Sequence, residues 1–145
     1  MKYYIAYGSN TPQEMVDRCP DSVFLGVVEL VGYELIFSRY ATIRPSFEKT
    51  LKVALYLISD EDERNLDYYE GYPDLYKKVE VIVGYKTDIR AMVYIMNDKY
   101  LDYTFPSNDY LFRCASGYKK MGIPLEQLLT AIDVTAKNFL EACYE

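Results

Sequence analysis

Short runs of β-branched and aromatic residues follow one another along this chain, with few helical segments between them. Strands outnumber helices, and no strict strand–helix–strand alternation occurs, so most neighbouring strands can pair antiparallel. The sequence therefore predicts an α+β fold with a small, mixed, mostly antiparallel sheet that curls toward a barrel and carries helices on its flanks. The predicted strands are Lys2–Tyr7, Val23–Glu29, Tyr33–Arg39, Leu51–Ile58, Val79–Val83 and Ala91–Met96.

Start and stop signals predict four helices. Thr11 and Pro12 have the chemistry of an N-cap and a first helical residue. Asp60 and Glu63 have the spacing of a capping box, and Gly71 stands where that helix should stop. The first helix is short, and two more are expected over residues 107–121 and 125–144.

The connections are predicted to be short. Leu30–Gly32 fits a hairpin or a tight bend, and a turn is expected near Thr87 and Asp88. Ala41–Lys49 contains Pro45 and is expected to be less regular. Since we find no linker, repeat or low-complexity stretch, we expect one domain over residues 1–145.

Hydropathy and charge limit the partners. No apolar run approaches the roughly 20 residues of a membrane helix, and the apolar start is too short for a signal peptide. We therefore expect a cytoplasmic protein without a membrane partner. The formal net charge of −6 repels phosphate backbones, which makes nucleic acid an unsuitable partner. The oligomeric state stays open.

The chain has no histidine, which restricts its possible chemistry. A Ser-His-Asp triad, a Cys-His dyad and most transition-metal sites are excluded, so a catalytic base must be a carboxylate, lysine, tyrosine or thiolate. Cys19, Cys114 and Cys143 lie far apart, which argues against a disulfide framework and against zinc. We expect them to be small buried apolar residues. No metal or cofactor is expected.

The segment Tyr7-Gly8-Ser9-Asn10 joins the first strand to the first helix start. Gly8 allows close approach of a ligand or a positive φ, and the N–H groups of Gly8, Ser9 and Asn10 could converge on an anion. An ordinary turn has the same composition, so both interpretations stand.

Glu70 ends the predicted second helix just before Gly71. A carboxylate at the negative end of a helix is unfavourable by about 0.3–1 kcal/mol. Nearby tyrosine rings, among them Tyr69 and Tyr76, could bury it and raise its pKa toward that of a working base. On physical grounds alone a solvated surface glutamate is the favoured alternative.

Gly117 lies inside a predicted helix, where glycine costs about 1 kcal/mol relative to alanine. A backbone or a ligand could therefore pack closely there, and tight packing between elements is the simpler explanation.

Taken together, these segments resemble the γ-glutamylcyclotransferase-like (AIG2-like) family over nearly the whole chain. The resemblance rests on the order and spacing of Tyr7–Asn10, of Leu66-Asp67 followed by Glu70-Gly71, and of Ser107, Tyr110, Gly117 and Gly122–Glu126. Members of that family cyclise a γ-glutamyl group to 5-oxoproline and release an amine or amino acid, with no cofactor.

The resemblance implies a role for each matched residue. Glu70 would be the catalytic base, and the loop from Tyr7 through Gly8 and Ser9 to Asn10 would hold the glutamyl portion. Three further tyrosines would line the substrate pocket and offer hydroxyls: Tyr76, Tyr94 and Tyr110.

Three alternatives remain beside this small-molecule enzyme. The chain could be a binding module that keeps the pocket without turnover, or an enzyme that acts on a carrier-bound γ-glutamyl group. It could also be a tyrosine-rich structural domain, although Glu70 and the three-part resemblance favour the enzyme.

Overall fold

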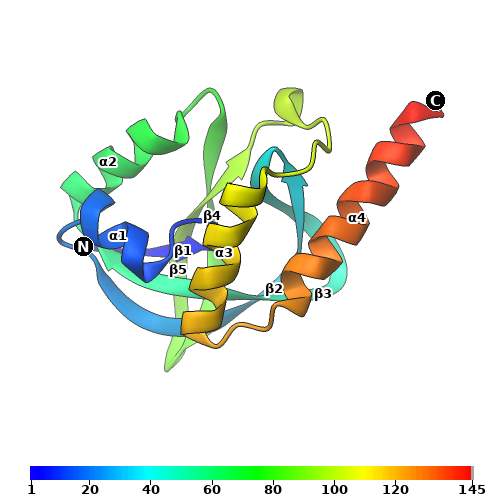
Figure 1. The fold of residues 1–145 in the computed structure, drawn as a ribbon. Coiled ribbons are helices and arrows are strands. Elements are labelled where there is room, and N and C mark those ends of the chain that lie inside the picture. Colours follow the sequence, from blue (N-terminus) through cyan, green and yellow to red (C-terminus); the bar gives the residue numbers. More distant parts are fainter. Residues whose placement is uncertain (145) are drawn as a thin grey trace.

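The structure is a computed structural model that describes residues 1–144, and Figure 1 shows its fold. Five strands and four α-helices lie within this range. The strands are β1 (Lys2–Ala6), β2 (Val23–Ser38), β3 (Tyr40–Ile58), β4 (Tyr76–Tyr85) and β5 (Thr87–Met96). The helices are α1 (Pro12–Arg18), α2 (Asp60–Glu70), α3 (Asn108–Met121) and α4 (Glu126–Cys143), with a short 3-10 turn at Asp98–Tyr100.

The strands form one sheet in the order β2-β3-β1-β5-β4. The pairs β1–β3, β2–β3 and β4–β5 are antiparallel, and β1 runs parallel to β5. The outer strands β2 and β4 approach each other, so the sheet is strongly curled, with helices packed around it (Figure 1). The predicted α+β class and its mostly antiparallel sheet are confirmed.

The hairpin predicted at Leu30–Gly32 is wrong, because β2 runs without a break from Val23 to Ser38. Gly32 has a φ of +87° and lies opposite a bulge of β3 that is formed by residues 46–49. The chain reverses later, at Arg39. The stretch around Pro45, expected to be irregular, belongs to β3. Pro45 pairs with Tyr33, in a part of β3 that extends past the end of β1.

The helix ends follow the sequence signals with one shift. Ser59, not Asp60, is the N-cap of α2: its Oγ accepts from the N–H of Asp62, and Asp62 Oδ2 accepts from the N–H of Ser59, both at 3.1 Å. The capping box is therefore one residue earlier than predicted. Gly71 ends α2 in the left-handed conformation, as expected, and Gly122 ends α3 in the same way.

The cysteines only partly follow the prediction. Cys19 and Cys114 are buried, whereas Cys143 is exposed near the end of α4, so the expectation of a buried residue is wrong there. All three are free thiols. None of the helices within residues 1–144 has the length and hydropathy to cross a membrane.

The buried residues form two clusters on the two faces of the sheet. The larger one joins β2, β3 and β5 to α3 and α4, and includes Phe37, Val53 and Tyr118. The smaller one lies between β1, α1 and α2, and includes Met15 and Leu66. Together they hold the end of β1, the end of α2 and the start of α3 around one hollow.

Candidate active site

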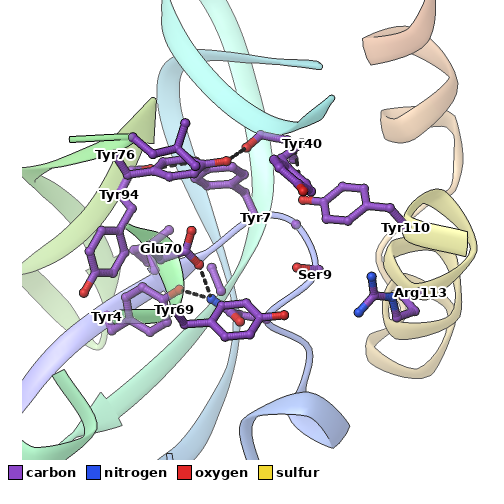
Figure 2. A pocket seen from close by; sticks show the side chains of 16 residues that line it. Tyr4, Tyr7, Ser9, Tyr40, Tyr69, Glu70, Tyr76, Tyr94, Tyr110 and Arg113 are labelled. Carbon is purple, nitrogen blue, oxygen red and sulfur yellow. Dashed lines mark hydrogen bonds between the residues drawn. The ribbon is translucent and has the colours of Figure 1, made fainter. Parts of the chain in front are cut away.

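A cavity of about 300 Å³ opens where β1 ends. Every residue that the sequence predicts for the site lies on its wall: Tyr7, Gly8, Ser9, Asn10, Glu70, Tyr76, Tyr94 and Tyr110. They come from the β1–α1 loop, the end of α2, two neighbouring strands and α3 (Figure 2). The fold thus gathers segments that lie far apart in the sequence, from Tyr7 to Tyr110.

Glu70 is the last residue of α2, and its carboxylate faces this cavity (Figure 2). Its Oε1 accepts a hydrogen bond from Asn10 Nδ2 at 3.0 Å. Burial raises the pKa of the Glu70 carboxyl, and the Asn10 bond and the charge of Arg18 oppose that rise. No group within residues 1–144 donates to Oε2, so this oxygen is open to the cavity contents.

Asn10 connects Glu70 to a cation. Its Oδ1 accepts from Arg18 Nη1 at 2.5 Å, which requires that the amide nitrogen face the other way. That nitrogen donates both to Glu70 and to the hydroxyl of Tyr4, the latter at 2.7 Å. Arg18 is itself held on the ring of Tyr69, 3.7 Å from its centroid. The side chain of Asn10 therefore orients the carboxylate, a role that its place in the loop did not reveal.

The loop before Asn10 leaves backbone donors free. Within residues 1–144, the N–H groups of Gly8, Ser9 and Asn10 donate to no other protein group. Gly8 does not have a positive φ, so that part of the prediction is wrong. Glycine suits this position because a side chain has no room there: a Cβ on Gly8 would lie 3.0 Å from Ala41 Cβ and 3.2 Å from the Tyr110 hydroxyl.

The tyrosines of the site use their hydroxyls mainly to hold the walls. The hydroxyl of Tyr7 donates to the carbonyl of Tyr94 at 2.6 Å, and that of Tyr76 donates to the carbonyl of Ala41 at 2.8 Å. The Tyr94 hydroxyl donates to Asp67, also at 2.6 Å, and burial raises its pKa. Tyr110 accepts from the N–H of Ala41 at 3.0 Å. These residues therefore shape the cavity and keep their rings toward it.

Gly117 is explained by packing between elements. A Cβ on Gly117 would lie 2.0 Å from Thr11 Cγ2, so α3 is pressed against the start of α1. No ligand is needed to account for this glycine. Among residues 1–144, no group of three His, Cys, Asp or Glu side chains has the arrangement of a metal site.

Several wall residues were missed from the sequence. Arg113 follows Tyr110 by three residues, and this helical spacing could have placed both on one face. Only Tyr110 of this helix was expected on the pocket wall, so its spacing to Arg113 was the signal that could have found the arginine. Six other missed residues are Tyr4, Ile5, Ala6, Tyr40, Ala41 and Leu75, and Tyr69, which was expected only as a ring near Glu70, also lines the cavity.

The chain was compared with protein-family models and with known sequences. A family model described as "Gamma-glutamyl cyclotransferase, AIG2-like" matches residues 4–112, which include Glu70 and the loop. Among curated protein sequences no significant match is found.

Solved structures give the same context. A structure named gamma-glutamyl cyclotransferase is 25% identical, with a TM-score of 0.75 over 90% of this chain and 85% of that chain. The uncharacterized protein loc79017 from Homo sapiens gives the same identity, coverage and TM-score. YkqA from Bacillus subtilis is 20% identical over 91% of this chain and 54% of its own, with a TM-score of 0.72, and shares the fold.

Proposed function

Because the chain belongs to the gamma-glutamyl cyclotransferase, AIG2-like family, we propose that it cyclises a γ-glutamyl group to 5-oxoproline and releases the attached amino acid or amine. The α-amine of the substrate attacks its own γ-carbonyl carbon, so the nucleophile belongs to the substrate. The reaction is intramolecular, and a cavity that holds the reactive conformation supplies much of the rate.

The position of Glu70 is the observation that carries this proposal. Its carboxylate faces the cavity with one oxygen not engaged by groups within residues 1–144, and burial raises its pKa. A substrate α-ammonium has a pKa of about 8. A carboxylate with a raised pKa takes a proton from that group more readily than an ordinary glutamate does, so Glu70 is suited to be the general base.

The bond changes balance without an outside reactant. One C–N bond forms as the ring closes, and the C–N bond to the leaving group breaks. Two protons leave the α-ammonium nitrogen and two reach the leaving nitrogen, so Glu70 can accept a proton and return it. The free N–H groups of Gly8 and Ser9 are suited to stabilise the oxyanion that develops on the γ-carbonyl.

The test is direct detection of the product. Purified protein is incubated with γ-glutamyl amino acids, γ-glutamyl amines and glutathione, and 5-oxoproline is measured by mass spectrometry beside Glu70→Gln. We expect product from the wild type and a rate lower by about 10²–10⁴-fold in the variant, since that is what a general base contributes.

Two results would contradict parts of this proposal. A wild-type rate from Glu70→Gln would remove Glu70 from the base role. No product from any substrate, with a folded protein, would favour a carrier-bound γ-glutamyl group or a binding module without turnover.

A further inference from the structure

Arg113 is a cation on the cavity wall for which the proposed chemistry has no use. It is exposed on α3, one turn after Tyr110, and it is the only positively charged residue among those lining the cavity. Glu70 is the only negatively charged one. No ion pair within residues 1–144 includes the Arg113 guanidinium.

The guanidinium is oriented toward the cavity. Its carbon lies 5.9 Å from the centroid of the Tyr110 ring, and Figure 2 shows it pointing toward Ser9. A guanidinium presents a planar fork of N–H donors that matches a carboxylate, and such charge-assisted bonds are among the stronger ones. In a chain with a net charge of −6, a free cation here gives the cavity mouth a local preference for an anion.

We infer that Arg113 binds a carboxylate on the leaving group, so that the preferred substrates are γ-glutamyl amino acids rather than γ-glutamyl amines. This inference rests on the proposed function of the same cavity. It makes Arg113 a residue that determines specificity.

The geometry favours the leaving group over the substrate's own α-carboxylate. The α-ammonium nitrogen and the α-carboxylate carbon are joined through one carbon and lie only about 2.5 Å apart. If Glu70 takes the ammonium proton, the α-carboxylate stays at the Glu70 end. Arg113 lies on the opposite side of the cavity, with Ser9 between them (Figure 2). The chain beyond the γ-carbonyl can reach that side.

The surroundings of Arg113 leave room for the rest of an amino acid. A second hollow of about 220 Å³ lies between α1 and α3, bordered by Pro12, Phe112 and Arg113 itself. Arg113 thus stands between the cavity and this hollow. A released amino acid could place its carboxylate on Arg113 and its side chain toward the hollow.

Two matched ligands test this inference. γ-Glutamyl-alanine carries the carboxylate, and γ-glutamyl-alaninamide has the same shape without the charge. Their binding to Glu70→Gln and to Glu70→Gln/Arg113→Gln is measured by calorimetry. We expect the first protein to bind the carboxylate form at least about 10-fold more tightly and the second to bind both alike. Lys119→Gln, which removes a charge from the same helix away from the cavity, should keep the preference.

Turnover of the two ligands is then measured with protein that keeps Glu70. This distinguishes a failure of the present inference from a failure of the proposed function. 5-Oxoproline from the amide would support the cyclase activity whatever Arg113 does, and its absence from both ligands would contradict that activity. Equal binding of both ligands to Glu70→Gln would overturn the inference. An equal loss of affinity for both ligands on Arg113→Gln would also overturn it, because that result would place the glutamyl α-carboxylate on the guanidinium. In Arg113→Lys, part of the preference should return.

Discussion

Glu70 lies on the cavity wall, at a position in α2 that is electrostatically unfavourable for a carboxylate. It is a carboxylate at the negative end of α2, and burial raises its pKa. The folded state therefore binds a proton at Glu70 more tightly than the unfolded chain does. Stability from this group is present at low pH and is lost as the pH rises from the ordinary carboxyl pKa through the raised one.

Glu70→Gln should accordingly lose activity without losing stability. The amide cannot ionise, and its oxygen can still accept from Asn10. At neutral pH the free energy of unfolding should equal or exceed that of the wild type, as measured by urea denaturation. At lower pH the difference should shrink, because wild-type Glu70 becomes protonated as the pH falls through its raised pKa. A variant that is clearly less stable at neutral pH would show that the ionised carboxylate supports the fold.

The charge of Arg18 should tune the pH dependence of catalysis. The proposed base, Glu70, would work only when ionised, so kcat/KM should fall as the pH drops through the raised Glu70 pKa. The charge of Arg18 opposes that rise. Arg18→Gln keeps a donor for Asn10 but removes the charge, so the acid limb should move to higher pH.

A pH–rate profile for Arg18→Gln and Arg18→Lys measures this effect. The lysine variant retains the charge and should keep the acid limb near its wild-type position. If both variants share the wild-type profile, Arg18 has only a structural role in holding Tyr69 and Asn10.

At the scale of elements, α3 and the start of α1 depend on one contact. Gly117→Ala gains about 1 kcal/mol of helix propensity, but its Cβ would lie 2.0 Å from Thr11 Cγ2. Overpacking of this kind costs about 1–3 kcal/mol, so we expect a net loss of stability by thermal denaturation. Thr11→Gly removes the obstructing side chain, and glycine is tolerated at an N-cap.

A double-mutant cycle separates the two effects. In the Thr11→Gly background, Gly117→Ala should be neutral or stabilising, so the two changes should be strongly non-additive. Additive losses would mean that the Thr11 contact does not limit how closely α3 approaches.

The helices and turns also show which local features could be predicted from sequence patterns. The sequence located α2 and its stop at Gly71, since a left-handed cap has a specific chemistry. It misjudged Gly32, because a glycine with positive φ serves a hairpin and a bulge equally well. The capping box was misplaced because Ser59 and Asp60 are both good N-caps and only the backbone path selects one.

The site follows the same rule. Glu70 and the loop were proposed through the family resemblance, because on physical grounds alone a surface glutamate and an ordinary turn were equally acceptable or favoured. The direction of the Asn10 side chain depends on tertiary packing, so Arg18 could not be proposed, whereas the spacing of Arg113 to Tyr110 was a signal that the sequence did contain.

At the scale of the whole molecule, the curled sheet brings together segments that are distant in the sequence, and these segments line the cavity. β1 lies centrally, between β3 and β5, so the loop at its end meets α2 on one side and α3 on the other (Figure 1). A ligand in the cavity must therefore contact parts of the chain that are independent in sequence, and its binding should stabilise them together.

Hydrogen exchange tests this coupling. Glu70→Gln saturated with γ-glutamyl-alanine should show slower exchange in residues 7–10, at the end of α2 and in the first turns of α3. The bulge around residues 46–49, which lines no part of the cavity, is the internal control and should not change. Protection confined to another hollow, such as the one of about 160 Å³ between β2 and α4, would place the ligand elsewhere. Because three separate segments must respond together, a chance effect on one loop could not produce the expected pattern.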